Sequence, residues 1–571
     1  MTEVRVETRS VPAGARFPKD IAPLLARIYA ARGLQDALEL DRSLGRLITP
    51  DALDDIDRAA QRVAQAIRAD ESILIVGDYD ADGATAVALS VSVLRALGAN
   101  AVDFLVPNRF QFGYGLSPEI VALLKHRPPR VLITVDNGVS SVAGVAAANE
   151  LGIDVIITDH HLPGQTLPDA FAIVNPNLAG SGFPSRALAG VGVAYYLFAR
   201  VRAALRDVGW FTNRPAPNLA DWLDLVALGT VADVVPLDHN NRVLVHQGIA
   251  RMRTGRCRPG IRALAEIAKK TLARLTEQDL GFALGPRLNA AGRLEDMAIG
   301  IRCLLADDPG EARTLARALD ELNHARRELE AEMVRDAEFI VGQHATAAAD
   351  RFGVCVYDPG WHQGIVGLVA GRLRERIDRP VIAFADAGAI AADELRGSAR
   401  SIPALHVRDA LDAIATRYPG MLSRFGGHAM AAGLTIRRTH YPRFARAFDA
   451  EVERRVPPSA FTRTLETDGS LDDQELSLAT ARLLRDAGPW GQGFPPPLFH
   501  DTFDVVSQRV VGQQHLRLVL RRGRRVVDAI AFRQAPLPDA RSVAIVYRPE
   551  ENDFGDPPTL QLVVEHLRVL A

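Results

Sequence analysis

The chain has 571 residues, of which 48% are hydrophobic and 24% are charged, and its formal net charge is only −2. A chain of this length needs more than one hydrophobic core, so we expect two to four domains. No apolar run approaches the ~20 residues of a membrane span, and no signal peptide is visible, so we expect a soluble protein of the cytoplasm. The three cysteines are too widely spaced for a disulfide framework or a cysteine zinc site.

Short apolar runs alternate with helical stretches in the first third of the chain. We predict strands at Ile73–Val76, Val102–Val106, Val131–Val135 and Val155–Thr158, and helices at Ala84–Leu97, Pro118–Lys125 and Val142–Leu151. This βαβα order predicts an α/β domain with a mostly parallel sheet. Nearly continuous apolar strands indicate a sheet covered on both faces, and such sheets bind ligands beyond the carboxyl ends of their strands.

Polar motifs follow the ends of these strands. Asp78, Asp80 and Asp82 follow the first strand in the sequence DYDADG, and alternate residues of an extended segment point the same way, so their carboxylates can converge. Three like charges this close repel one another unless a cation neutralises them. By itself the motif also fits an acidic turn before a capped helix, but Asp136 follows the third strand and His160 the fourth. Three remote segments therefore deliver metal-binding side chains to one edge of the sheet.

A fourth segment supplies Asp233, at the end of a predicted buried helix within Asp221–Leu237. Aspartate and histidine without cysteine suit Mn²⁺ best, and Mg²⁺ is the alternative. The set suits two ions about 4 Å apart, with Asp136 as the bridging carboxylate because it follows the middle strand. Such a pair activates water and clamps a phosphoryl centre, which predicts phosphoester hydrolysis. The predicted metal ligands are Asp78, Asp80, Asp82, Asp136, His160 and Asp233.

The pair His160-His161 offers two roles. Adjacent residues that leave a strand point in opposite directions, so we expect His160 on the metal and His161 turned toward the phosphate as hydrogen-bond donor or general acid. The reverse assignment stays open. His161 and Asp136 are thus the predicted catalytic residues.

Several further residues are candidates for binding phosphate. Arg109, in VPNRFQFGYG, follows the second predicted strand, where its guanidinium can hold a phosphate bidentately or form a loop salt bridge. The motif FGGHAMAAGL is expected just before a helix, so that glycine N–H groups and the helix dipole face an anion. The candidates beside Arg109 are Arg287, Asn289, Ser398, Arg400, Gly426, Gly427 and His428.

The second half of the chain predicts a long charged helix at Pro309–His344 and then a second α/β lobe, from Phe352 to about Arg455. Five short strands follow a Pro/Gly-rich connector and predict a small OB-like barrel. The predicted domains are an N-terminal arm at 1–70 that packs on the core or the barrel, a catalytic domain at 71–307, a connecting helix at 308–345, the second lobe at 346–457 and the barrel at 458–571.

The barrel segment carries the one clear basic patch. Between Arg509 and Arg548 there are nine arginines against two acids, Asp528 and Asp539. Small five-stranded barrels bind single strands through basic grooves, although a solvated arginine surface would give the same pattern. Few aromatic residues are interleaved there, so base stacking would be weak.

Taken in chain order, DYDADG, VPNRFQFGYGL, TVDNG, TDHH, VALGTVADVVPL, GPRLNAAGR, HQGIVG, GSARS and FGGHAMAAGL resemble the DHH phosphoesterase superfamily with its DHH-associated domain. Within it, they are similar to the RecJ family of bacterial single-strand-specific exonucleases. The resemblance runs from Ile73 to Leu434 and continues into the OB-like tail. Ala399 is a departure, because many relatives carry glycine at this position.

The resemblance implies a Mn²⁺- or Mg²⁺-dependent exonuclease that degrades single-stranded DNA 5′→3′ to mononucleotides in recombinational and mismatch repair. It implies a cleft between the lobes that is too narrow for a duplex. It implies single-stranded DNA as the partner of a monomer, with a single-strand binding protein and a RecQ-type helicase as candidate protein partners. The residues implied are Asp80, Asp82, Asp136, His160 and Asp233 on the metal, with Asp78 on it or beside it, and His161, Arg109, Arg287, Ser398 and Arg400 on phosphate.

Other functions also fit parts of the chain. A nanoRNase or oligonucleotide phosphodiesterase of the same superfamily would resemble only the two lobes, whereas this chain adds an arm and a basic barrel. A catalytically inactive scaffold would lack metal ligands, and here the set is intact. A module that merely binds single strands would use only the OB-like tail.

Overall fold

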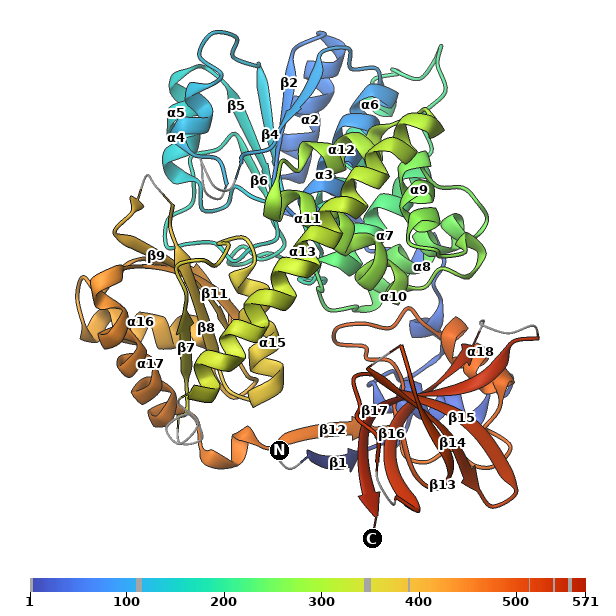
Figure 1. Cartoon of the computed structure of the whole chain (residues 1–571). Coiled ribbons are helices and arrows are strands. Elements are labelled where there is room, and N and C mark those ends of the chain that lie inside the picture. Colours follow the sequence, from blue (N-terminus) through green and yellow to red (C-terminus); the bar gives the residue numbers. More distant parts are fainter. Residues whose placement is uncertain are drawn as a thin grey trace. The chain divides into compact units, whose positions relative to one another are not determined.

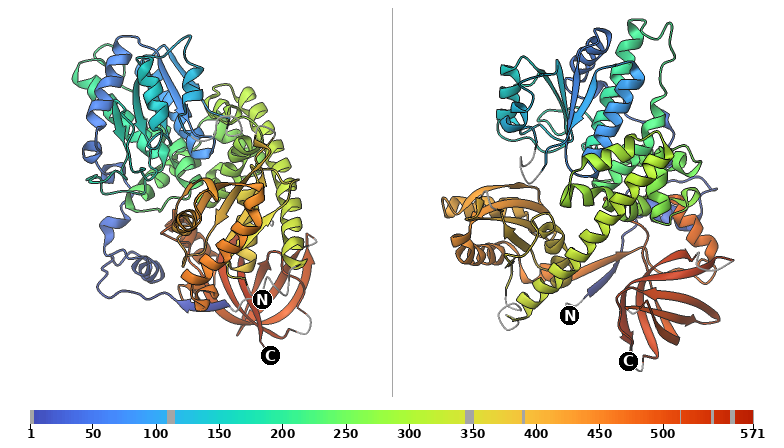
Figure 2. Two further views of the ribbon diagram at one scale, coloured as in Figure 1. Left: turned by 90° about the vertical axis from the view of Figure 1, so that its left-hand side faces the viewer. Right: turned by 45° about the horizontal axis from the view of Figure 1, so that its top comes forward.

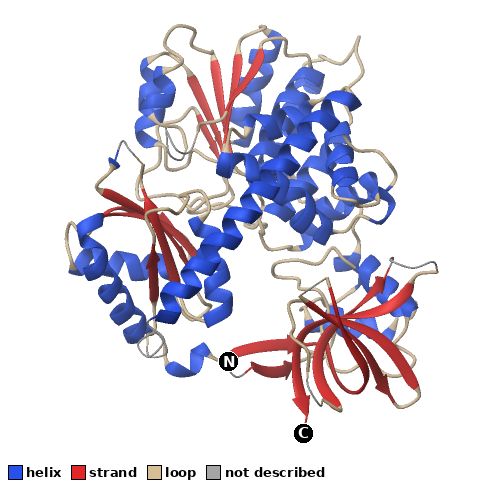
Figure 3. Cartoon of the chain, viewed as in Figure 1, coloured by secondary structure: helices blue, strands red, loops and turns tan. Residues whose placement is uncertain are grey.

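The computed structural model describes residues 4–108, 115–343, 351–388, 391–512, 514–537, 540–552 and 557–570. These residues form two compact units, Thr8–Glu321 with Thr467–Ala571, and Met1–Glu7 with Leu322–Glu466. The first unit contains a parallel sheet, a group of helices and a barrel, and the second contains a mixed sheet (Figures 1 and 3). Among the described residues, no helix is long and apolar enough to cross a membrane.

The parallel sheet of the first unit confirms the predicted βαβα order. Its strands lie in the order β3-β2-β4-β5-β6, and every neighbouring pair is parallel. The predicted strands are found to within one or two residues, and β6 is an addition that we did not predict. The strands are β2 (Ile73–Gly77), β3 (Val102–Leu105), β4 (Val131–Val135), β5 (Asp154–Thr158) and β6 (Ala172–Val174).

Helices cover both faces of this sheet, as the apolar strands predict. Every residue of β4 is buried. On one face α4 and α5 pack in a shared apolar cluster that includes Ile120, Val145 and Ile157. On the other, α3 packs on β2 and β3, α6 on β4 and β5, and α2 on β6. These helices are α2 (Ile56–Arg68), α3 (Ala81–Leu97), α4 (Pro118–Ala122), α5 (Val142–Glu150) and α6 (Gly190–Asp207).

A group of helices continues the chain beyond α6 (Figure 2). Helix α7 is buried along nearly its whole length and packs against α3, α6 and α8. The long charged helix predicted from Pro309 is confirmed as α13, which begins in this unit and continues in the other. The helices are α7 (Leu223–Ala232), α8 (His239–Arg253), α9 (Pro259–Ile267), α10 (Glu277–Asp279), α11 (Gly285–Leu294), α12 (Ala298–Leu305) and α13 (Pro309–Gln343).

The five C-terminal strands close into the predicted barrel, in the order β13-β14-β15-β17-β16. Only the β15–β17 pair is parallel. The N-terminal helix α1 (Pro23–Ala31) packs beside the connector to this barrel, where Tyr29 meets Trp490 at a ring separation of 6.1 Å. The strands are β13 (Phe499–Val511), β14 (His515–Arg522), β15 (Arg525–Ala531), β16 (Ser542–Asn552) and β17 (Thr559–Leu570), and α18 (Leu478–Ala487) precedes them.

The second unit is built on a mixed sheet in the order β10-β11-β9-β8-β7. Helices α16 and α17 share an apolar core with this sheet, and α15 lies against β8 and β9. The elements are β7 (Val354–Tyr357), α15 (Val366–Ile377), β8 (Val381–Asp386), β9 (Glu394–Arg400), α16 (Val407–Arg417), β10 (Leu422–Gly427), β11 (Ala431–Arg437) and α17 (Tyr441–Arg455); outside the sheet, β1 (Val4–Thr8) pairs with β12 (Arg463–Thr467).

One prediction for this unit is wrong. We expected FGGHAMAAGL to precede a helix, but it forms the antiparallel β10–β11 hairpin. At Gly427, φ is +140°, and an added Cβ would lie 2.4 Å from the carbonyl oxygen of Ala431. Glycine is therefore required by the tight turn of the hairpin.

Candidate metal centre

Four segments of the first unit converge at the carboxyl edge of the parallel sheet. The turn between β2 and α3 carries Asp78, Asp80 and Asp82, and Asp136 directly follows β4. The pair His160-His161 follows β5, and Asp233 is the C-terminal cap of α7. This arrangement is the one that parallel strands predict, because their carboxyl ends meet at one edge.

Two of these segments pack closely against the backbone of neighbouring helices. An added Cβ at Gly190, the first residue of α6, would lie 2.4 Å from the Cβ of Asp136. At Gly292 in α11, an added Cβ would lie 1.8 Å from the carbonyl oxygen of Tyr79. Asp136 itself has a φ of +62°, which costs a non-glycine residue about 1–3 kcal/mol. Its carboxylate is thus held in place by the helices around it.

The side chains form three overlapping groups in which one ligand atom per residue lies within 4.8 Å of the others. Asp136 belongs to two of them, which suits a carboxylate shared between two ions. The structure thus brings together all six predicted ligands and adds His161. The groups are Asp136 with His160 and His161, Asp82 with His160 and Asp233, and Asp78 with Asp80 and Asp136.

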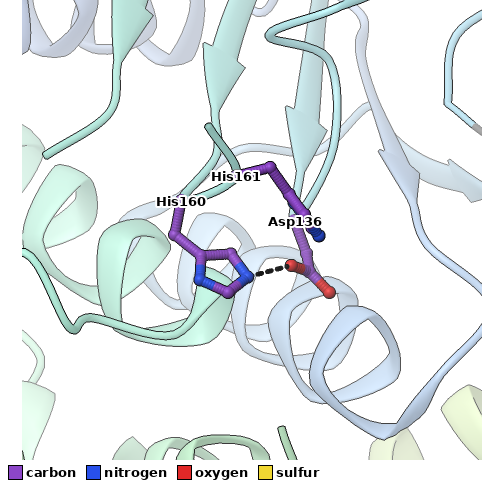
Figure 4. A group of neighbouring side chains, drawn as sticks. All are labelled: Asp136, His160 and His161. Carbon is purple, nitrogen blue, oxygen red and sulfur yellow. Dashed lines mark ion pairs between the residues drawn. The ribbon is translucent and has the colours of Figure 1, made fainter. Parts of the chain in front are cut away.

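His160 lies at the centre of the cluster. Its Nε2 is 3.1 Å from Oδ1 of Asp136, the ion pair drawn in Figure 4. The same Nε2 is 3.5 Å from Oδ2 of Asp233. Its ring is 4.6 Å from the ring of His161, centroid to centroid. We expected the two side chains to point apart, but their rings lie close together. Side chains alternate only within a strand, and β5 ends at Thr158, before both histidines.

The carboxylates of the cluster resist ionisation in the absence of a cation. Burial and the neighbouring charge of Asp80 raise the pKa of Asp82 to about 7. Burial and the charge of Asp82 also raise the pKa values of Asp136 and Asp233 well above the usual range. Buried like charges of this kind are stabilised by a divalent cation, and carboxylate with imidazole is a donor set that Mn²⁺ accepts. The site fits a metal ion.

Asp159 was not among our predicted site residues, although its side chain organises the histidine pair. Its Oδ1 accepts hydrogen bonds from the backbone N–H groups of His160 and His161 and lies 2.8 Å from Nδ1 of His161. Burial opposes ionisation of Asp159, but its contacts with His161 outweigh that effect and lower its pKa. Burial likewise opposes the charge on His161, but Asp159 outweighs it and raises the pKa of His161 to about 9.

Asp82 and Asp80 also contact backbone N–H groups. The N–H groups of Gly190 and Val191, at the start of α6, donate to the carboxylate of Asp82 at 2.6 and 3.0 Å. Asp80 caps α3 by accepting a hydrogen bond from the N–H of Gly83 at 3.0 Å. Helix N-termini stabilise negative charge, so both carboxylates are held in position before any metal binds.

The structure describes two of the three predicted phosphate-binding residues of this unit, Asn289 and Arg287. Oδ1 of Asn289 accepts a hydrogen bond from the N–H of Ala81 at 2.8 Å, and so braces the turn between β2 and α3. Arg287 is buried and donates to Asp320 at 2.9 Å and to the carbonyl of Ala283 at 2.6 Å. Arg109 lies outside the described residues. Phosphate binding by Arg287, Asn289 and Arg109 stays a prediction.

The remaining candidates belong to the second unit, on or directly after strands β9 and β10, which flank β11 in its sheet. Ser398 and Arg400 lie on β9, and Nη1 of Arg400 is 3.3 Å from Oγ of Ser398. Gly426 and Gly427 end β10, and the N–H of His428 donates to the carbonyl of Ala431 at 2.8 Å. Their part in binding a substrate also stays a prediction.

Comparisons with known proteins cover most of the chain. Models of the DHH family N-terminal domain, the DHHA1 domain and the RecJ OB domain match residues 72–230, 350–454 and 467–566. The chain is 49% identical to the single-stranded-DNA-specific exonuclease RecJ of Escherichia coli, over 99% of both chains. It is 48% identical to the Haemophilus influenzae protein of the same name, over 98% of both. A crystal structure of Thermus thermophilus RecJ in complex with Mn²⁺ superposes with a TM-score of 0.82 at 30% identity, covering 100% of this chain and 80% of that one.

Proposed function

Because the chain belongs to the RecJ family of single-stranded-DNA-specific exonucleases, we propose that it removes mononucleotides from the 5′ end of single-stranded DNA with two Mn²⁺ ions. The observation that carries this proposal is the largely buried cluster of five aspartates and two histidines at the carboxyl edge of the parallel sheet. Its donor atoms suit Mn²⁺, with Mg²⁺ as the alternative, and its relatives include RecJ structures that contain either ion.

When bound, the two ions supply a hydroxide from water at neutral pH and neutralise the charge that develops on the phosphoryl oxygens. The protein side chains hold the ions in position and donate hydrogen bonds or protons to the substrate. Asp136 lies in two of the three groups, and we assign it the bridging position. We assign metal ligation to Asp78, Asp80, Asp82, His160 and Asp233.

His161 is assigned to the phosphate. Its Nδ1 is 2.8 Å from Oδ1 of Asp159, and we assign its Nε2–H as the donor to a phosphate oxygen or to the leaving oxygen. The contact with Asp159 favours the protonated ring, as the raised pKa of about 9 indicates. His161 is therefore suited to act as a hydrogen-bond donor or general acid at neutral pH.

The barrel supplies a second surface for the same substrate. Arg509, Arg524, Arg525 and Arg541 have exposed side chains on it. Exposed guanidinium groups attract a phosphate backbone, and this contribution does not depend on base sequence. We propose that the barrel at 458–571 binds the single strand while the domain at 71–307 cuts it. A single-strand binding protein and a RecQ-type helicase remain our candidate protein partners, in recombination and mismatch repair.

The test uses long single-stranded DNA labelled at its 5′ or its 3′ end, with Mn²⁺ and the full chain. Early release of labelled mononucleotide from the 5′-labelled strand, and its absence with Asp136→Ala, is the expected result. Early release from the 3′-labelled strand would contradict the proposed polarity.

A dinucleotide assayed in parallel tests the second candidate function. Cleavage of the dinucleotide with the long strand left intact would indicate an oligonucleotide phosphodiesterase of the same superfamily. We expect the long strand to be degraded, because the chain carries a barrel that the two lobes of such enzymes lack. No Mn²⁺-dependent cleavage of either substrate would indicate a binding scaffold.

A further inference from the structure

Three asparagines surround the metal centre without belonging to any of its ligand groups. Asn137 follows Asp136 directly, and Asn175 and Asn177 follow strand β6 in the sequence Asn-Pro-Asn. Each directs its side-chain amide N–H at the backbone carbonyl of a residue in, or next to, a metal-binding segment. We call these three residues the asparagine brace.

Asn177 and Asn175 donate hydrogen bonds to the backbone carbonyl groups of the histidine pair. Nδ2 of Asn177 donates to the carbonyl of His160 at 2.6 Å and lies 3.3 Å from the carbonyl of Arg186. Nδ2 of Asn175 donates to the carbonyl of His161 at 2.9 Å. The two are themselves joined, because the N–H of Asn177 donates to Oδ1 of Asn175 at 2.8 Å. The peptide groups of both histidines are therefore fixed by one short turn after β6.

Asn137 ties together the two strands that carry the acidic segments. Its Nδ2 donates to the carbonyl of Val76 on β2 at 3.1 Å and to that of Val135 on β4 at 2.9 Å. The strands are parallel neighbours whose register ends with Gly77 opposite Val135. Just beyond this point, Asp78 directly follows β2 and Asp136 directly follows β4. Asn137, which is fully buried, thus bonds to both strands next to the point where the two acidic segments begin.

The negative charge of the site explains why these three residues are asparagines. A backbone carbonyl needs a donor, and among side chains the amide offers two N–H groups in a fixed plane. Lysine or arginine would also donate, but a positive charge here would compete with the metal ion for the carboxylates. Aspartate would have no proton to donate and would add to the repulsion among the acids. Asparagine supplies the hydrogen bond without altering the charge of the cluster.

We propose that Asn137, Asn175 and Asn177 are positioning residues that hold the metal-binding segments in the geometry required for Mn²⁺ before the ion arrives. This inference rests on the metal centre of the proposed function. Without the brace, the segments carrying Asp78, Asp136 and His160 would have to be ordered on binding. Residues that orient metal ligands through hydrogen bonds contribute about 10- to 100-fold in metal affinity or activity.

The experiment measures Mn²⁺ binding to the full-length chain by isothermal titration calorimetry, with MnCl₂ alone and no DNA. We expect Asn177→Ala and Asn137→Ala each to raise the Mn²⁺ dissociation constant by about tenfold or more. The matched control is Asn149→Ala. In the unaltered chain Nδ2 of Asn149 donates to the carbonyl of Asp169 at 2.8 Å in the same domain, on a residue outside every ligand group. The Mn²⁺ dissociation constant of Asn149→Ala should equal that of the unaltered chain.

Thermal unfolding in EDTA separates positioning from general stability. Asn177→Ala and Asn149→Ala should lower the metal-free melting temperature by similar small amounts, whereas only Asn177→Ala should reduce the rise produced by Mn²⁺. An unchanged Mn²⁺ dissociation constant in Asn177→Ala would overturn the inference while leaving the metal centre intact. An unaltered chain that takes up no Mn²⁺ would overturn the proposed metal centre and this inference with it. Asn177 is only half-buried, so we expect Asn177→Ala to fold. The inference can then be tested with Asn177→Ala even if Asn137→Ala does not fold.

Discussion

The metal centre and the barrel each gather charges of one sign, but the metal centre buries negative charges whereas the barrel exposes positive ones. At the carboxyl edge of the sheet, Asp78, Asp82 and Asp136 are buried together, and the pKa values of the latter two are raised. On the barrel, arginines are exposed to water or paired with acids, as Arg517 is with Asp528 at 3.0 Å. Buried like charges need a specific ion, whereas exposed ones are already satisfied by solvent and counterions. The first region is therefore built for chemistry and the second for salt-dependent binding.

The largest expected effect comes from breaking the buried cluster. Asp136→Asn keeps the shape of the side chain but removes the shared charge, so Mn²⁺-dependent cleavage of single-stranded DNA should fall by about a thousandfold. The estimate assumes that the metal site contributes several kcal/mol to the barrier, at about 1.4 kcal/mol per factor of ten. Initial rates of nucleotide release measure it. Asp207→Asn, at the exposed end of α6, serves as the control and should retain full activity. Retained activity in Asp136→Asn would remove Asp136 from the mechanism.

The second prediction concerns stability and pH. The folded-state pKa of Asp82, about 7, lies above its ordinary value of 3.8, so the folded chain binds protons more tightly than the unfolded chain in this range. The metal-free protein should therefore lose stability as the pH rises from about 4 to about 7. Melting temperatures in EDTA across this range measure the effect, and Asp82→Asn should flatten the profile.

Mn²⁺ should reverse this trend, because the ion binds the deprotonated carboxylates and its stabilisation grows with pH. At a concentration one hundred times its dissociation constant, it should add about 2.7 kcal/mol to the free energy of unfolding. An Mn²⁺ effect that is independent of pH would mean that the cluster is not where the ion binds.

The smallest effect is expected on the barrel. Replacing Arg524 and Arg525 with glutamine should weaken binding of single-stranded DNA and reduce the slope of log affinity against log salt by about 0.7 for each lost phosphate contact. The full chain, assayed in EDTA to prevent cleavage, can be titrated at several salt concentrations by fluorescence anisotropy. The matched control is Arg517→Gln, because the ion pair of Arg517 with Asp528 already offsets its charge. Equal losses in both variants would argue against a special role for the exposed arginines.

Much of the fold could be predicted because its signals are local. The strands of the parallel sheet are apolar runs, the helix from Pro309 is a long, heavily charged stretch, and the barrel strands follow a Pro/Gly-rich connector. The metal ligands could be predicted because parallel topology sends the ends of β2, β4 and β5 to one edge. That rule needs no knowledge of side-chain contacts.

What we did not predict depends on contacts between distant residues. Strand β6 has only three residues, and the functional reason for Asn175 and Asn177 after it lies in hydrogen bonds to a different loop. The glycines at Gly426 and Gly427 suit either a helix N-terminus or a hairpin, and only the pairing of β10 with β11 decides between them. The rings of His160 and His161 lie 4.6 Å apart, and Asp159 binds both backbone N–H groups, neither of which alternation along a strand reveals.

The proposed function requires two Mn²⁺ ions at the carboxyl edge of the parallel sheet. Anomalous diffraction from crystals grown with MnCl₂, recorded at the manganese edge, tests it most directly. We expect two peaks about 4 Å apart, on either side of Asp136 and within reach of His160 and Asp233. A single peak would contradict the two-ion assignment, and the absence of any peak among these residues would contradict the metal centre itself.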